Sequence, residues 1–144
     1  MIPEFIAYLY RITRKSPKEL GKISNARVNQ LLSPLCKNLF LSDDNYSTTS
    51  VDEANIFTKA SSIESVTYTS EHDCDNFSFA LNGYWSDSLY SFCFGVAWSG
   101  NHAFNLMIDD KEKIWICEPQ NNMWFDLETI KLNAQYYPFR LILI

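Results

Sequence analysis

Apolar side chains in the first part of the chain recur at the spacing of a helix. Phe5, Leu9 and Ile12 share one face behind Pro3, which suits a first helical turn. Residues 3–14 are therefore expected to form an amphipathic helix that packs one face against the rest of the domain.

Polar residues mark further helix starts before position 61. Residues 16–19 have the sequence of a capping box with proline at the first helical position, which predicts a short turn. Ser24 suits the N-cap of a second helix that Pro34 ends, and residues 51–60 are weakly helical. The polar stretch 42–50 between them predicts a loop.

The second half of the chain has the alternating pattern of strands. Residues 63–68 predict a strand that leads to Cys74, and apolar positions at helical spacing predict a helix over 77–84. Five strands are then expected, at residues 89–98, 102–108, 113–118, 123–127 and 137–144. This order predicts an α+β domain in which N-terminal helices are followed by an antiparallel β-meander.

Length and composition suit one domain over residues 1–144. Hydrophobic residues make up 47% of the chain, enough for a core without disulfides or metal. The net charge of -5 argues against nucleic-acid binding, and the basic residues between Arg11 and Lys22 are interpreted as a solvated helix face. No apolar run has membrane-spanning length, so no membrane partner is expected. The oligomeric state stays open.

The spacing of the cysteines limits the metal and redox chemistry that the chain can carry and suggests its cellular compartment. Cys36, Cys74, Cys93 and Cys117 form no CxxC pair, which argues against a zinc finger or a redox motif. The apolar stretch near the N-terminus is too short for a signal peptide. Free thiols in a reducing cytoplasm are the simplest expectation.

Cys74 differs from the other three cysteines because polar residues surround it. Its neighbours include His72, Asp73 and Asp75, whereas the others lie in apolar sequence. A thiol at or just before a helix N-terminus has a lowered pKa, and the free amides there can hold an oxyanion. Cys74 is therefore a candidate nucleophile.

His102 and Glu118 are the candidate partners of Cys74. A three-residue turn at 109–111 would place His102 directly opposite Glu118 on one face of a hairpin, within reach of a hydrogen bond. A four-residue turn would separate them onto opposite faces. The order Cys, His, acid predicts that Cys74, His102 and Glu118 act as nucleophile, base and orienting group.

Other residues near these motifs have alternative roles. Asn105 and Gln120 are candidates for binding substrate or orienting the catalytic residues. His72 is a second candidate for the base, with a poorer geometry because it is only two residues from Cys74. A mixed metal site stays open as a further alternative, but its ligands lack regular spacing: His72, Asp73, Cys74 and His102. No metal ligand is assigned.

Three motifs resemble those of a papain-like group of cysteine peptidases. They are Asp73-Cys74-Asp75-Asn76-Phe77, His102-Ala103-Phe104-Asn105 and Ile116-Cys117-Glu118-Pro119-Gln120. The group includes the C-terminal protease domain of the fairy-ring mushroom agglutinin and small phage and bacterial domains. The resemblance covers residues 63–144, the expected catalytic core, and leaves the helical segment 1–60 without a counterpart. It implies a papain-like or transglutaminase-like fold and suggests calcium only faintly, through Asp75.

These observations favour a cysteine hydrolase that cleaves or transfers an amide or peptide bond. Cys74 would attack the carbonyl, His102 would move the proton and Glu118 would hold the imidazole. The expected substrate is a protein or peptide, and no cofactor is required. The alternative is a catalytically inactive papain-like fold that acts as a protein-binding inhibitor or as a phage or plasmid accessory protein.

Overall fold

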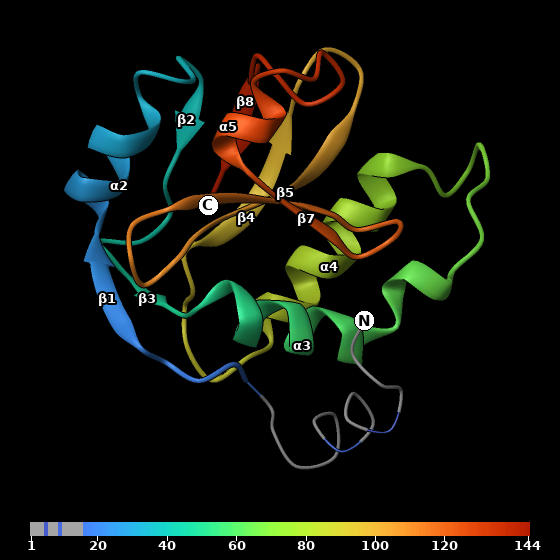
Figure 1. The fold of residues 1–144 in the computed structure, drawn as a ribbon, viewed down its shortest axis with the longest axis horizontal. Helices are drawn as coiled ribbons and strands as arrows, with labels where there is room; N and C mark the ends of the chain where they lie inside the picture. The colour runs from blue at the N-terminus through green and yellow to red at the C-terminus, as the bar shows by residue number, and fades with distance from the viewer. Residues whose placement is uncertain (1–4, 6–8, 10–15) are drawn as a thin grey trace.

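The protein is organised around one six-stranded sheet (Figure 1). The computed structural model describes Phe5, Leu9 and residues 16–144. The strand order in the sheet is β2-β8-β4-β5-β6-β7, and a separate two-stranded sheet joins β1 to β3. The helix expected over residues 3–14 lies outside the described residues.

Strands and helices follow one another along the described chain. In order they are β1 (Gly21–Ser24), α2 (Asn25–Leu32), β2 (Leu39–Phe40), β3 (Asn45–Thr48), α3 (Val51–Ser61), the 3-10 helix η1 (Ile63–Ser65), α4 (Cys74–Ser86), β4 (Phe94–Trp98), β5 (Ala103–Ile108), β6 (Ile114–Glu118), β7 (Met123–Asp126), α5 (Leu127–Ile130) and β8 (Leu141–Leu143).

The predicted order of N-terminal helices followed by an antiparallel β-meander is wrong. Three strands already lie before α3, and β2 pairs with β8 in parallel. The last strand, β8, also inserts between β2 and β4 instead of extending a meander. The protein is a mixed, sheet-rich fold to which both ends of the described chain contribute strands, and the expected papain-like or transglutaminase-like arrangement is corrected accordingly.

Tertiary contacts explain the local errors in the first half. Glu19, the expected capping-box acid, accepts a hydrogen bond from Ser47 Oγ at 2.8 Å, and the chain from Gly21 runs as a strand. The expected loop at 42–50 contains β3, because Tyr46 is buried at 2% exposure and anchors the segment. Before Cys74 the chain forms η1 and a loop in place of the predicted strand.

The N-cap predicted for the second helix is confirmed, because its side chain bonds a nearby backbone amide. Ser24 accepts a hydrogen bond from the Arg27 amide at the start of α2. Ser50, which was not predicted as a cap, does the same for Glu53 at the start of α3. The predicted strands around β4 to β7 are also present, each shorter than its sequence pattern. Local patterns therefore located these elements although the overall order was wrong.

Both faces of the central sheet are covered by helices. On one face Leu106 and Ile116 pack with Leu32 of α2 and Ile130 of α5. On the other, residues such as Met107 pack against α3 and α4. Strand β5 is consequently buried at every position, as a strand covered on both sides requires.

Gly95 allows the last strand to approach β4 closely. A Cβ atom at this position would lie 1.9 Å from the backbone oxygen of Leu143. Any other residue would therefore push β8 away from β4. The glycine is a steric requirement of the strand order.

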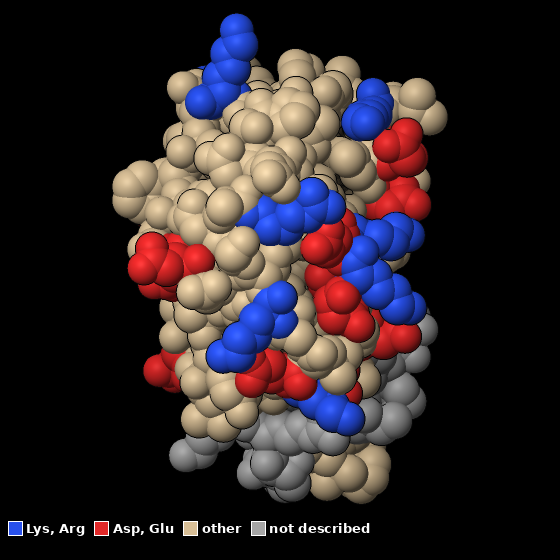
Figure 2. Space-filling view, turned by 90° about the vertical axis from the view of Figure 1, so that its left-hand side faces the viewer, with Lys and Arg blue, Asp and Glu red and all other residues tan. Residues whose placement is uncertain are grey.

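Charges of both signs are interleaved on the face that bears α2 and β1 (Figure 2). Arg27 pairs with Glu112 at 2.6 Å, and Lys22 lies 3.6 Å from Glu19. This alternation gives the face the character of an ordinary solvated surface. Among the described residues, no helix has both the length and the apolar character needed to cross a membrane.

Two buried thiols make the stability of the fold sensitive to alkaline pH. Burial raises the pKa of Cys93 to about 12 and that of Cys117 well above its ordinary value. Above about pH 8.5 the unfolded chain releases these protons while the native state keeps them, so stability decreases as pH rises. We expect the free energy of unfolding in urea to fall by several kcal/mol between about pH 7 and pH 10.5. Cys93→Ala should reduce this slope, and an unchanged slope would contradict the assignment.

Candidate functional site

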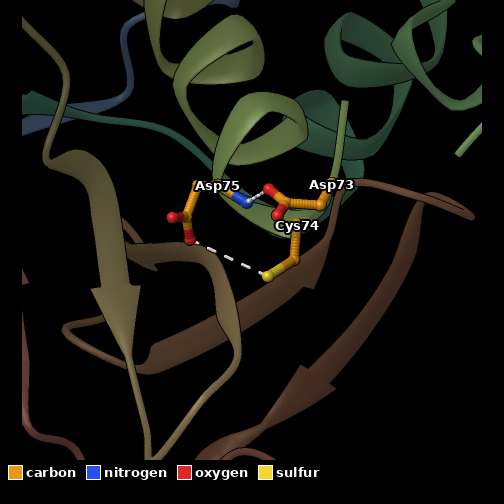
Figure 3. Close-up of side chains that lie close together, drawn as sticks. All are labelled: Asp73, Cys74 and Asp75. Atoms are coloured by element: carbon orange, nitrogen blue, oxygen red, sulfur yellow. Dashed lines mark hydrogen bonds between the residues drawn. The ribbon is translucent and has the colours of Figure 1, made fainter. Parts of the chain in front are cut away.

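Cys74 is the first residue of α4 (Figure 3). Asp73 is the N-cap, and its carboxylate accepts a hydrogen bond from the Asp75 amide at 3.3 Å. The Asn76 side chain accepts in return from the Asp73 amide at 3.1 Å. These reciprocal bonds fix the helix start and with it the position of the thiol.

Cys74 is also the one partly exposed thiol in the chain. Cys36, Cys93 and Cys117 are buried, and all four cysteines are free of disulfides. Reagents in solution therefore reach Cys74 before the others. The expectation that its polar neighbours distinguish Cys74 is confirmed by its exposure.

The sulfur of Cys74 lies between a carboxylate and the backbone that precedes His102. Sγ is 3.8 Å from Asp75 Oδ1 and 4.0 Å from the Asn101 carbonyl oxygen. Trp98 donates its indole N–H to the same Asp75 oxygen at 3.2 Å. The end of β4 and the loop that follows it therefore lie against the start of α4. This contact brings Cys74 close to the segment that carries His102.

The surroundings of Cys74 do not give the lowered thiol pKa expected at a helix start. Burial raises the pKa of Cys74, and the carboxylates of Asp75 and Asp73 raise it further. The backbone amide of Ala103 lowers it in part. Deprotonation at neutral pH therefore needs a base close to the sulfur.

His102 and Glu118 form a tight pair. Their Nε2 and Oε2 atoms are 2.6 Å apart, and both side chains are largely buried. Tyr136 donates its hydroxyl to the same Glu118 oxygen at 3.0 Å and packs its ring edge-on against His102. Burial and Glu118 raise the pKa of Tyr136, so it remains a donor over the working pH range. Glu118 thus holds two donors in fixed positions.

The predicted hairpin register is wrong, yet the predicted contact forms. Ile108 pairs with Ile114, which is two residues beyond the expected register. A shift of two residues keeps side chains on the same face of a sheet, because their orientation alternates with period two. His102 and Glu118 are therefore diagonal neighbours, and a glutamate is long enough to span that separation.

Glu118 leaves the second ring nitrogen of His102 unoccupied, and among the described residues no hydrogen bond joins that ring to Cys74 Sγ. Nε2 is bound to Glu118, and Nδ1 makes no hydrogen bond within the described part of the chain. Cys74 contacts the backbone on both sides of His102, at Asn101 and Ala103.

Asn105 and Gln120 occupy different environments from each other. Asn105 is fully buried, and its amide donates to the backbone oxygens of Ser78 at 3.0 Å and Gly95 at 3.1 Å. It therefore ties α4 to the sheet. Its side chain lies below the surface of the site, whereas it was expected to contact substrate at that surface. Gln120 is half-buried, and its backbone amide donates to Glu118 Oε1 at 3.4 Å.

The other proposed ligands are not brought into one site. His72 packs edge-on against Phe77, and its buried Nε2 has no hydrogen-bond partner in the part of the chain that the structure describes. Among the described residues, the potential ligand atoms that gather within 4.8 Å come from Asp73, Cys74 and Asp75, without either histidine. Two carboxylates and a thiol fall short of the six to eight oxygen ligands that calcium takes.

Comparisons with known proteins show a similarity of fold. No family model and no curated protein sequence matches the chain. Two solved structures match 85% of it at 22% identity: a complex of PSL1a with E64, at a TM-score of 0.71, and Polyporus squamosus lectin bound to the human-type influenza-binding epitope Neu5Aca2-6Galb1-4GlcNAc, at 0.68. The chain spans about half the length of each, 50% and 49%.

These matches correct the assignment made from the motifs. The matched chains are described as PSL1a and a lectin, not as cysteine peptidases, and no family model supports a papain-like group. The predicted cysteine hydrolase, its transglutaminase-like variant and the alternative papain-like inhibitor are overturned by this finding. The ligands that accompany the matched chains are E64 and a sialylated glycan, whereas a protein or peptide was expected.

Two residues of the site were not predicted from the sequence. Tyr136 reaches Glu118 from the loop after α5, and Trp98 reaches Asp75 from the end of β4. Neither belongs to a local motif, and both bonds join residues that are distant in sequence. In the sequence, only the aromatic character of Tyr136 and Trp98 could have indicated a role in the site. That signal is weak, because buried aromatic residues are common in any core.

The acidic residues beside Cys74 should make it select reagents by charge. We expect the trimethylammonium methanethiosulfonate reagent to modify Cys74 about five to ten times faster than the sulfonate reagent at low ionic strength, after normalisation to N-acetylcysteine. Concentrated salt should reduce this ratio by screening. Asp75→Asn should lower the ratio, with Asp52→Asn in α3 as the control for net charge. Equal rates for both reagents would contradict this electrostatic description.

Proposed function

We propose that Cys74 is a nucleophilic thiol, with His102 as its base and Glu118 as the group that orients the base. The observation that carries the proposal is the 2.6 Å His102–Glu118 contact beside the one partly exposed cysteine. In this site the thiol proton moves to His102 Nδ1 and the sulfur attacks an epoxide carbon of the ligand; the C–S bond forms as the ring C–O bond breaks, and the resulting alkoxide takes the proton back from His102. The proposal concerns this thiol reactivity and does not include amide-bond hydrolysis.

The electrostatics of the site support a role for the histidine. Because burial and two carboxylates raise the pKa of the Cys74 thiol, an isolated thiol here would react slowly at neutral pH. A neighbouring imidazole that accepts the proton offsets this, since its positive charge compensates the carboxylates. The reactivity of Cys74 should therefore depend on His102 to an unusual degree.

A matched structure suggests a probe for the site. PSL1a, whose fold is similar, forms a complex with E64. We propose that this chain also binds E64, at Cys74. Gln120, half-buried beside Glu118, is the residue we propose to contact the bound ligand.

Labelling of the thiol tests the proposal directly. At pH 7, iodoacetamide should modify Cys74 about a hundred times faster in the native protein than in His102→Ala, because the base is lost. Peptide mapping should show little modification of the three buried cysteines. E64 should add one adduct by intact mass, and Cys74→Ala should abolish both reactions.

Conservative variants separate chemistry from folding. Glu118→Gln preserves the shape of the side chain, loses its charge and should give an intermediate rate. Circular dichroism confirms that each variant is folded before its rate is compared. Equal alkylation rates in the native protein and a folded His102→Ala variant would overturn the proposal.

Glycan binding is a second candidate function, because one similar structure is a lectin bound to a glycan. The site carries an aromatic pair that suits the apolar face of a sugar: the rings of Phe79 and Trp98 are 5.7 Å apart, and Phe79 is 51% exposed. Asp75, bound to the Trp98 indole, adds a hydrogen-bond acceptor and a negative charge. This charge favours a neutral sugar over a sialylated one.

Titration with two glycans tests this candidate. Galβ1-4GlcNAc should shift the NMR signals of Trp98 and Phe79, and the sialylated trisaccharide should bind more weakly because Asp75 repels its carboxylate. Trp98→Ala should abolish the shifts, while Trp124→Ala on β7 serves as the matched control. Shifts that persist in Trp98→Ala would contradict binding at this pair.

The thiol proposal also requires a reducing environment. Four free cysteines suit a cytoplasmic location, which we retain as part of the proposal.

A further inference from the structure

A cavity lies at the opposite end of α4 from Cys74. It has a volume of about 590 Å³ and is bounded by the end of α4, the loop at 88–92 and the ends of β2 and β8. A helix of 13 residues is about 20 Å long, so this cavity is separate from the thiol site. Its size is that of a pocket for a small molecule.

Aromatic rings form the floor of this cavity. Trp85 and Phe94 stack with centroids 4.3 Å apart, and Phe92 meets Trp85 edge-on at 5.5 Å. The Trp85 indole N–H is bound to Thr58, so its polar edge is already satisfied outside the cavity. Trp85 and Phe94 are only 2% and 6% exposed, so they support the cavity from below. The rings open to a ligand are Phe40 and Tyr90, 62% and 41% exposed, whose faces can attract a cation.

Hydrogen bonds hold the walls of the cavity in place. Ser91 Oγ donates to Asp43 Oδ2 at 2.5 Å, which joins the loop at 88–92 to the opposite wall. The backbone of Ser47 supports the same loop by bonding Ser91 at 2.7 Å and Cys93 at 2.9 Å. The cavity is therefore formed before any ligand enters.

The electrostatic character of the cavity is negative. Asp43 is the charged residue of its lining, which among the described residues includes no lysine or arginine. The C-terminal end of α4, where the helix dipole is negative, faces the same space with Ser86 in the lining. Tyr90 adds a further ring at the rim, 41% exposed. Exposed aromatic rings beside a carboxylate match an organic cation.

We infer that this cavity binds a small organic cation, an ammonium group carried on an apolar or aromatic body. The ammonium pairs with Asp43, and the apolar body packs against the exposed rings of Tyr90 and Phe40. The thiol chemistry of Cys74 is not involved, so the cavity is an independent binding site.

Three probes of nearly equal shape test the inference: phenethylamine, 2-phenylethanol and phenylacetate. In ¹H–¹⁵N NMR titrations of the full chain, phenethylamine should shift the amides of the loop at 88–92 and the Trp85 indole. The alcohol should bind about five to ten times more weakly, and the carboxylate should not bind. Equal affinities, or shifts confined to the start of α4, would overturn the inference.

Asp43→Asn tests the source of the preference. It keeps the hydrogen bond from Ser91 and removes the charge, so the amine should lose about fivefold in affinity while the alcohol is unaffected. Asp44→Asn is the matched control, since Asp44 is adjacent but outside the lining. Identical amine affinities for these two variants would also overturn the inference. Tests of Cys74 labelling are unaffected by either result.

Discussion

The geometry of the candidate site depends on one buried amide group. Asn105 on β5 donates to the backbone of Ser78 in α4 and to Gly95 in β4, so one side chain joins the helix to two strands. Ser78 in turn donates its hydroxyl to the Cys74 carbonyl at 2.8 Å. The helix that carries the thiol and the strand that follows His102 are therefore held at a fixed distance. A buried amide with both hydrogens bonded resists displacement, because breaking either bond leaves a polar group without a partner.

The pairing of His102 with Glu118 was more predictable than the fold. Cys74, His102 and Glu118 could be selected because a polar cysteine before a helix and a pair of polar residues on neighbouring strands are local signals. The contact between His102 and Glu118 survived an error in register, since a shift of two residues preserves the face of the sheet. The sequence could not show that acidic neighbours raise the pKa of the thiol, which depends on their distance and burial.

The overall order of elements could not be derived in the same way. The parallel pairing of β2 with β8 joins Leu39 to Ile142, and no local pattern specifies a contact over such a separation. Glu19 has the sequence context of a helix cap but bonds Ser47 on another strand, so a tertiary contact overrode the local preference. Asn105 likewise has the same polar character in sequence whether it faces a ligand or the core. The resemblance to papain-like peptidases rested on short motifs, and the lectin matches changed that assignment.

The unequal exposure of the four cysteines has a consequence for handling the protein. Peroxide and dissolved oxygen attack accessible thiols, and Cys74 is the cysteine that solvent reaches. Oxidation would convert it to a sulfenic acid and then to sulfinic and sulfonic acids, while the core sulfurs stay intact. Material stored without a reductant would thus keep its fold and lose the free thiol at the start of α4, so an aged preparation and a fresh one would look alike by every measure of folding.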